Sequence, residues 1–307
     1  MELTEQLLKD ALQYGKCFTR NGNTAEYIPE LRRVNKYQLG IAAVDMDGNM
    51  MEAGDTQTPF TIQSISKIIS LIMAIEDKGA NYLFNDKVGV EPTGDPFNSI
   101  VKLETQERPF NPFINAGAIV VASCIDGETS EECFDRFLEY TRRLCHNDTI
   151  DLNRDVYESE RETGDRNRSL AYFLKASGVL EGNVAECLDF YFKMCSVSVT
   201  ARDIAYLSAV LANDGKSPVT GEEMLTPQNA KMIRALMLTC GLYDGSGKFA
   251  MTVGFPAKSG VGGGITVALL NHMGIGVFGP ALDEKGNSIG GIKMLEYLSD
   301  RLQYELF

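Results

Sequence analysis

Phe60-Thr-Ile-Gln-Ser-Ile-Ser-Lys67, followed by the apolar run Ile-Ile-Ser-Leu-Ile-Met-Ala-Ile-Glu-Asp-Lys78, is the stretch around which this chain is organised. Ser64 and Lys67 stand three residues apart where the helical run begins, and residues three apart share a helix face. Lysine activates serine as a base when burial or a second cation leaves its amine neutral. Free N–H groups at a helix N-terminus stabilise an oxyanion. The stretch therefore predicts a nucleophile, its base and part of an oxyanion hole.

The spacing of serine and lysine does not establish this chemistry by itself. Both residue types are common, and the chain carries a second copy of the spacing at Ser99-Ile-Val-Lys102. That copy runs into the polar segment Leu-Glu-Thr-Gln-Glu-Arg, so no apolar helix follows it to bury the pair. Evidence from other parts of the sequence is needed to distinguish a catalytic pair from a chance occurrence at Ser64 and Lys67.

The composition is that of an ordinary globular protein. The 307 residues are 44% hydrophobic and 23% charged, with a net charge of −13, and this negative charge argues against binding of nucleic acid or anionic membranes. The seven cysteines are odd in number and contain no C-x-x-C pair, which disfavours a zinc site or a disulfide framework and suits a reducing cytosol. Neither a signal peptide nor a membrane-spanning run is recognisable. We expect a cytoplasmic protein.

Strand patterns lie towards both ends of the chain, and helical patterns fill its middle. Helical periodicity is found at residues 3–16, 133–144, 170–177, 184–194, 201–211, 227–238 and 287–306. Strand patterns are found at 39–45, 50–54, 251–253, 265–270 and 274–278. The simplest architecture is α+β: an antiparallel sheet flanked by helices, from about residues 1–80 and 241–307, with an all-helical subdomain at about 81–240. An active site is expected in the crevice between them.

A second, glycine-rich stretch is Gly254-Phe-Pro-Ala-Lys-Ser-Gly-Val-Gly-Gly-Gly-Ile265. Its Lys-Ser-Gly (258–260) opens a strand, and the glycines that follow let another backbone or a ligand approach closely. Together with the earlier S-x-x-K, it matches the first and last motifs of penicillin-recognising serine enzymes. Lys258 near Lys67 would help to keep Lys67 neutral, and an N–H near Val261 would complete the oxyanion hole. The alternative is a plain glycine-rich turn between strands.

Two other patterns are interpreted as structural. Gly274-Ile-Gly-Val-Phe-Gly279 fits G-x-G-x-x-G, but it is itself an apolar strand with no following helix to bind a pyrophosphate. His146 and His272 are far apart in the sequence and lack the company of metal ligands. A Ser-His-Asp triad is possible on paper, but we interpret His272 as structural.

Ordered motifs along nearly the whole chain resemble the bacterial serine-dependent glutaminase family, whose fold is that of the β-lactamases and penicillin-binding proteins. Besides the two stretches quoted above, the motifs are Ala25-Glu-Tyr-Ile-Pro29, Pro109-Phe-Asn-Pro-Phe-Ile-Asn-Ala-Gly-Ala118, Ser159-Glu-Arg-Glu-Thr-Gly-Asp-Arg-Asn167, Asp189-Phe-Tyr-Phe-Lys-Met-Cys-Ser196 and Cys240-Gly-Leu-Tyr-Asp244. The resemblance implies hydrolysis of L-glutamine to L-glutamate and ammonia through a γ-glutamyl-serine intermediate, with no metal or organic cofactor. It also implies a homo-oligomer, either a dimer or a tetramer.

The resemblance assigns roles to individual residues. It implies that Ser64 is the nucleophile and Lys67 its general base, that Tyr27 and Tyr243 approach the reaction centre, and that Tyr243 is the preferred proton shuttle. With Lys258 these residues form the expected catalytic set. The expected substrate-binding set is Ser64, Asn115, Glu160, Asn167, Tyr191, Tyr243 and Val261, the last through its backbone N–H in the oxyanion hole.

Elementary chemistry is compatible with these roles. Free glutamine carries an ammonium, a carboxylate and an amide, so its selective binding needs buried polar partners of both kinds. Glu160 suits the ammonium, and asparagine and tyrosine side chains donate to the carboxylate. Taken singly, each residue has a structural alternative: Glu160 in a solvated loop, Asn115 as the cap of a turn, and Tyr191 in the core.

Two other functions remain open at this point. The first is a β-lactamase-like or penicillin-binding serine hydrolase of the same fold, although those enzymes act outside the cytoplasm and no signal peptide is recognisable here. The second is a catalytically silent binding module on the same scaffold. An intact set of Ser64, Lys67, Tyr243 and Lys258 argues against decay of the site.

Overall fold

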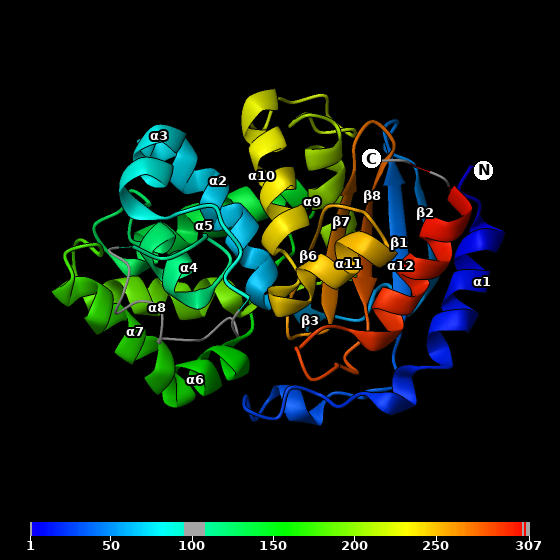
Figure 1. Ribbon diagram of the computed structural model, residues 1–307, viewed down its shortest axis with the longest axis horizontal. Coiled ribbons are helices and arrows are strands. Elements are labelled where there is room, and N and C mark those ends of the chain that lie inside the picture. Colours follow the sequence, from blue (N-terminus) through cyan, green and yellow to red (C-terminus); the bar gives the residue numbers. More distant parts are fainter. Residues whose placement is uncertain (1, 95–107, 303, 305–307) are drawn as a thin grey trace.

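A five-stranded antiparallel sheet forms one side of the molecule (Figure 1). The computed structural model describes residues 2–94, 108–302 and 304, so the second serine–lysine spacing at 99–102 lies outside the described residues. The strand order is β2-β1-β8-β7-β6. The strands are β1 (Gly40–Asp45), β2 (Met50–Gly54), β6 (Ala257–Ser259), β7 (Gly264–Leu269) and β8 (Met273–Phe278). Both ends of the chain thus build one sheet, as expected.

Helices cover both faces of this sheet. On one face, α1 (Glu5–Lys16), α11 (Ser246–Thr252) and α12 (Ile289–Leu302) share a hydrophobic core with inward-facing strand residues such as Ile41, Val267 and Ile275. On the other face, α9 (Ala201–Ala212) packs Ala205 and Ala209 against β1. The helix α9 belongs in sequence to the stretch 81–240, but it lies on the sheet.

The glycines of β8 allow α9 to approach this closely. A Cβ atom at Gly274 would collide with the backbone of Ala205 and Ala209, and one at Gly276 would collide with the carbonyl oxygen of Ala201. Glycine at alternate positions therefore brings the helix backbone directly onto the strand. This packing accounts for the first two glycines of the G-x-G-x-x-G pattern, which lie in the strand as expected, whereas Gly279 directly follows it.

The other side of the molecule is mostly helical (Figure 1). Its helices are α2 (Ser66–Lys78), α3 (Ala80–Tyr82), α4 (Asn115–Ala122), α5 (Ser130–Cys145), α6 (Arg154–Thr163), α7 (Asp165–Ala176), α8 (Val184–Cys195) and α10 (Pro227–Cys240). A small antiparallel sheet of β3 (Phe60–Thr61), β5 (Val197–Val199) and β4 (Asp151–Leu152) lies among them. In the described ranges, no helix combines the length and the apolar character that crossing a membrane requires.

Three local expectations differ from the structure. The expected strand at 251–253 is wrong: these residues end α11, because Phe249 and Val253, four apart, both face the core while Met251 is 81% exposed. Helix α4 was missed because all its residues are buried, which removes the amphipathic period. Helix α6 was missed because it is highly charged; it begins at Asn153, whose side chain accepts from the Val156 N–H.

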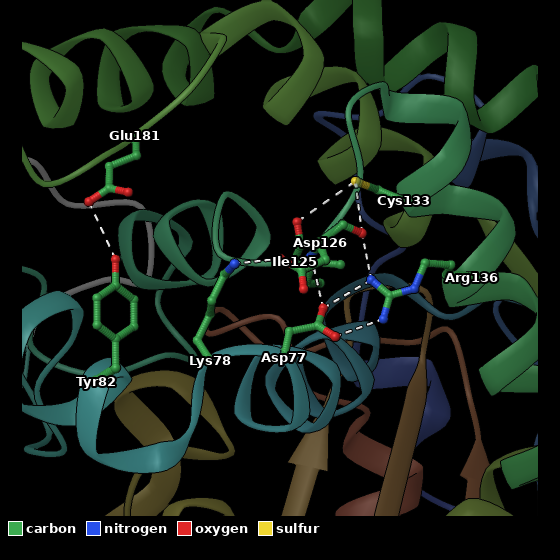
Figure 2. A network of polar contacts seen from close by, with 8 residues as sticks. All are labelled: Asp77, Lys78, Tyr82, Ile125, Asp126, Cys133, Arg136 and Glu181. Atoms are coloured by element: carbon green, nitrogen blue, oxygen red, sulfur yellow. Dashed lines mark hydrogen bonds and ion pairs between the residues drawn. The ribbon is translucent and has the colours of Figure 1, made fainter.

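The C-terminal end of α2 is anchored to α5 by a polar network (Figure 2). The Asp77 carboxylate accepts hydrogen bonds from both terminal nitrogens of Arg136, at 2.7 and 2.9 Å, and from the Asp126 N–H at 2.8 Å. Lys78 forms an ion pair with Asp126. Paired, hydrogen-bonded charges of this kind hold geometry well. The helix that begins just after Ser64 is therefore fixed at its far end.

Candidate active site

Ser64 lies where β3 turns into the helix α2. One 3₁₀ turn, η3 (Gln63–Ile65), joins the two elements, and Gln63 adopts a left-handed φ of 50°. Such a conformation is uncommon for a residue other than glycine and is often found at functional sites. The turn leaves Ser64 8% exposed, at the wall of a cavity. The predicted location of the serine at a helix start is confirmed.

A cavity of about 100 Å³ faces Ser64. Every residue of the two expected sets lines it except Lys67 and Lys258, which are buried, and Tyr243, which is half-buried. The lining residues are Tyr27, Gln63, Ser64, Asn115, Glu160, Thr163, Gly164, Arg166, Asn167, Tyr191, Cys195 and Val261. The fold thus brings together residues from six separate parts of the chain around one small polar space.

Lys67 is buried, with 1% of its surface exposed. Burial lowers the pKa of its amine to about 8, because the charged form loses its hydration. Its Nζ atom donates to the carbonyl oxygen of Phe113 at 3.0 Å and to Oδ1 of Asn115 at 2.8 Å. The Ser64 hydroxyl lies instead against the Tyr243 side chain, close enough to lower the pKa of the phenol. Lys67 is therefore positioned by α4 and the segment before it.

Asn115 connects Lys67 to Asn167 by two hydrogen bonds. While its Oδ1 accepts from Lys67, its Nδ2 donates to Oδ1 of Asn167 at 3.0 Å. The orientation of the Asn115 amide is thereby determined by both neighbours, since only this rotamer matches one donor and one acceptor. Asn115 was expected to bind the amino acid head group; in the structure it also holds the lysine.

Lys258 is the second buried lysine of the site. Its Nζ donates to the carbonyl oxygen of Ser259 at 2.6 Å and lies 4.7 Å from the centre of the Tyr243 ring. Burial, together with repulsion from Lys67, lowers the pKa of Lys258 well below its usual value. We expected Lys258 to help keep Lys67 neutral. Burial is the largest cause of the lowered pKa of both lysines.

Tyr243 begins a 3₁₀ turn, η5 (Tyr243–Gly245), with a left-handed φ of 53°. The Ser246 hydroxyl accepts from the Leu242 N–H and donates to the Tyr243 carbonyl oxygen, both at 2.9 Å, which closes the turn. Burial raises the pKa of the Tyr243 hydroxyl, while its hydrogen bonds to Ser64 and to the backbone of Val261 oppose that rise. The phenol is thus protonated at neutral pH and is in contact with the serine.

The glycine-rich loop after β6 lies directly on the Ser64 turn. A Cβ atom at Gly260 would approach the carbonyl oxygen of Ile62 to 2.7 Å and the backbone nitrogen of Ser64 to 3.3 Å. A Cβ atom at Gly262 would collide with the carbonyl oxygen of Thr61. The glycines therefore permit a close backbone approach, as predicted, and set Val261 between them at the cavity wall.

Glu160 is the buried acid of the cavity. Burial raises the pKa of its carboxyl to about 7, and a hydrogen bond from Gln63 and the nearby Lys67 oppose that rise. Tyr27 is largely exposed, but it lines the cavity. Burial of its hydroxyl raises the pKa of the phenol well above its usual value, and the nearby Tyr243 and Glu160 raise it further. The site therefore holds one carboxyl poised between its two protonation states.

A network on the outer side of α8 joins the helices that carry Glu160 and Tyr191. The Tyr157 hydroxyl, on α6, donates to Oδ1 of Asp189 at 2.5 Å. The other oxygen of Asp189 accepts from the Ser130 hydroxyl at 2.6 Å and pairs with Lys193 at 2.7 Å. Because Glu160 lies one turn beyond Tyr157 on the same helix, this network ties its backbone to α8.

Sequence reasoning did not single out five cavity residues: Gln63, Thr163, Gly164, Arg166 and Cys195. Each lies inside a motif already quoted, so the signal was present. None was singled out, because no pattern in the sequence indicated a role for that particular residue. The structure brings Gln63 to Glu160 and places the Cys195 thiol beside the Ser66 hydroxyl.

The histidines lie away from the cavity. His146 ends α5 and makes an edge contact with Tyr206, and His272 stacks on Tyr304 at a ring-centre distance of 4.0 Å. Their interpretation as structural residues agrees with these contacts. In the described part of the chain, no three His, Cys, Asp or Glu side chains are grouped so that they could hold a metal ion.

Comparisons with known proteins agree on one family. The family model described as Glutaminase matches residues 22–307. The chain is 52% identical over 305 residues to Glutaminase 2 of Clostridium perfringens (strain 13 / Type A), covering 99% of this chain and 100% of the relative. It is also similar to a probable glutaminase from Bacillus subtilis in complex with 6-diazo-5-oxo-L-norleucine, at 40% identity and a TM-score of 0.91, covering 100% of this chain and 99% of the other.

A third comparison concerns a covalent complex. The chain is similar to a Bacillus subtilis glutaminase bound covalently to 5-oxo-L-norleucine, formed by reaction of that protein with 6-diazo-5-oxo-L-norleucine. The identity is 40% and the TM-score 0.88, with 98% of each chain covered. A mixed α+β fold with an antiparallel sheet flanked by helices is common to this chain and these neighbours.

Proposed function

Because this chain belongs to the glutaminase family, we propose that the glutamine hydrolysis it catalyses proceeds through an ester between Ser64 and the γ-glutamyl group. The observation that carries this proposal is the arrangement of Ser64: it faces a polar cavity, touches Tyr243, and lies three residues before a lysine whose pKa burial lowers to about 8. A serine needs such a base to become a nucleophile.

The first step is attack of the Ser64 oxygen on the amide carbon of glutamine. Lys67 in its neutral form has two N–H bonds and one lone pair, and the two N–H bonds suit its two acceptors, Phe113 and Asn115. The lone pair is then available to receive the serine proton, directly or through the Tyr243 hydroxyl. The backbone N–H groups of Ser64 and Val261 stabilise the negative oxygen that forms.

Collapse of this intermediate breaks the carbon–nitrogen bond. The departing nitrogen takes up the proton that the serine released, so ammonia leaves and the ester remains on Ser64. We assign the delivery of this proton to Tyr243, because its side chain lies against Ser64 and burial keeps the phenol protonated. Water then attacks the ester, and one of its protons passes through the same groups to the Ser64 oxygen. The ester bond breaks and L-glutamate is released.

The head group of glutamine binds on the other side of the cavity. We propose that ionised Glu160 pairs with the substrate ammonium, and that the charge of the ammonium holds Glu160 in its ionised form despite burial. Asn167 and Tyr191 line the same side, together with the hydroxyl of Tyr27, and supply donors for the carboxylate. Asn115 lies between Lys67 and Asn167 and is proposed to bind the head group as well.

The direct test is release of ammonia from L-glutamine by the purified protein and by Ser64→Ala. L-asparagine and a chromogenic β-lactam serve as comparison substrates. The proposal predicts release from glutamine that Ser64→Ala abolishes. Turnover of the β-lactam without turnover of glutamine would favour the penicillin-recognising alternative. Silence of the folded protein towards all three would favour a binding module.

We also propose that the chain acts as a homo-oligomer in the cytoplasm. The oligomer is proposed from the family resemblance. The location is supported by the seven cysteines, which are all free thiols, six of them buried, as suits a reducing compartment. Light scattering coupled to size-exclusion chromatography tests the first point: a dimer or tetramer is expected, and a monomer at working concentration would contradict it.

A further inference from the structure

A second cavity lies between α11, α12 and the turn that precedes α12. Its volume is about 240 Å³, larger than that of the cavity at Ser64. The two helices lie side by side over one face of the sheet (Figure 1) and are linked by a hydrogen bond from the Ser299 hydroxyl to the Val253 carbonyl oxygen at 2.7 Å. The floor of the cavity is apolar, formed by Leu242, Phe249, Ile289 and Ile292. None of the residues expected to act on glutamine lines it.

Charged side chains of both signs surround this apolar floor. Lys248, Lys285 and Lys293 line the cavity against two carboxylates, Asp283 and Glu296, although the chain as a whole carries a net charge of −13. Lys293 is paired with Glu296 at 2.5 Å. Among the residues that the structure describes, Lys248 has no recorded ion-pair partner, so its ammonium is the cation available to a ligand.

Lys285 has a different partner, outside the cavity. Its Nζ lies 2.9 Å from the Asp244 carbonyl oxygen and 3.2 Å from the Asp244 carboxylate. This lysine therefore faces both the cavity and the turn η5, which carries Tyr243. A ligand in the cavity would lie against the segment that leads to the active site.

Thr252 supplies an independent observation. Thr252 lines the cavity, and its hydroxyl oxygen is buried and has no hydrogen-bond partner in the described part of the chain. A buried hydroxyl without a partner is unfavourable, and such groups in native proteins usually have one. An occupant of this cavity with an acceptor near Thr252 would provide that partner.

We propose that this cavity binds a small carboxylate with a compact apolar body, such as an aromatic or branched-chain acid. Apolar pockets with a few convergent polar groups are the usual form of small-molecule sites. The apolar body would lie on Leu242, Phe249 and Ile292, and the carboxylate would accept hydrogen bonds from Lys248 and the Thr252 hydroxyl. The site is distinct from the glutamine site, and the proposal stands whatever residue acts as nucleophile.

The test uses the intact protein with saturating L-glutamate present, so that the Ser64 cavity is already occupied. Phenylacetate and 4-methylpentanoate are titrated and followed by calorimetry and by amide hydrogen exchange. We expect saturable binding, with slower exchange in residues 243–252 and 283–296. Phenylacetamide, which lacks the charge, and inorganic phosphate, which lacks the apolar body, should each bind at least about tenfold more weakly.

Two variants locate the site. Lys248→Met keeps the apolar stem and should weaken phenylacetate binding about fivefold, as expected for one partly exposed charge pair. Thr252→Val keeps the shape and should weaken binding about threefold through the lost hydrogen bond. Lys231→Met, an exposed lysine on α10 outside the cavity, is the matched control. Absence of binding at millimolar carboxylate, equal binding of phosphate, or equal loss in Lys231→Met would overturn the proposal.

Discussion

The Nζ atom of Lys67 lies 2.8 Å from Oδ1 of Asn115, and this contact joins the proposed base to the substrate-binding half of the site. Nδ2 of Asn115 in turn donates a hydrogen bond to Oδ1 of Asn167. The side chain that positions the base thus also contacts a residue expected to hold the substrate. We therefore expect substrate binding and the pKa of Lys67 to be coupled through the Asn115 amide.

The pH dependence of kcat/KM should rise through neutrality. Lys67 acts in its deprotonated form, so activity increases as pH rises through its pKa of about 8. Glu160 acts in its ionised form, so activity also increases through its pKa of about 7. We expect a fall of about tenfold per pH unit just below pH 8, becoming steeper below pH 7 as both groups protonate. Initial rates across pH 5–9 measure this; a flat profile between pH 6 and 8 would contradict it.

Replacing Asn115 by aspartate should shift that profile. Asn115→Asp puts a carboxylate against Nζ of Lys67, which favours the charged lysine and raises its pKa by roughly one to three. The midpoint of kcat/KM should move to higher pH by a similar amount. Asn167→Asp adds the same charge one hydrogen bond farther from the lysine and is the control, with a smaller shift. Equal shifts in both variants would mean that the Asn115 contact does not tune the base.

The hydrogen bond from Tyr157 to Asp189 should affect substrate binding more than turnover. Tyr157→Phe removes a bond that ties α6, and with it Glu160, to α8. We expect KM to rise about fivefold with kcat within about twofold, and stability to fall by about 1.5–3 kcal/mol because the acceptor is charged. Tyr172→Phe, at an exposed position on α7, is the control. A loss of stability with unchanged KM would assign Tyr157 a structural role only.

Gly262 should not tolerate a side chain. In Gly262→Ala the added methyl group would collide with the Thr61 carbonyl oxygen, so the loop has to move away from the Ser64 turn. Displacing the Val261 N–H from the oxyanion position should lower kcat about a hundredfold or more. Gly247→Ala, where a methyl group meets nothing within 4 Å, is the control. Near-normal kcat in Gly262→Ala would show that the loop does not contribute to the oxyanion hole.

Much of the architecture could be predicted from local sequence. The apolar runs of the strands at 40–45 and 273–278 and the amphipathic pattern of α1 are local signals, and both ends of the chain meet in one sheet. Ser64 was placed at a helix start for the same reason. Helix α4 was not predicted because apolar residues lie on all its sides, so it shows no amphipathic period. Helix α6 was not predicted because few of its residues face the core.

The contacts that tune the site could not be predicted in the same way. The carbonyl oxygen that holds Lys67 belongs to Phe113, and a backbone oxygen leaves no mark in a sequence. The bond between Tyr157 and Asp189 joins residues 32 positions apart on two helices. The nearness of Lys67 and Lys258 could be predicted from the motifs, but the burial that lowers the pKa of both amines is determined only by the fold.

The identity of the nucleophile is the central claim, and one measurement tests it directly. The protein is incubated with 6-diazo-5-oxo-L-norleucine, digested, and the modified residue is located by mass spectrometry. We predict a 5-oxo-norleucyl group on Ser64, and no adduct in Ser64→Ala. Cys195 is the other nucleophilic side chain at the cavity, but burial raises the pKa of its thiol to about 12 and leaves it protonated. An adduct on Cys195, or on any residue other than Ser64, would contradict the account.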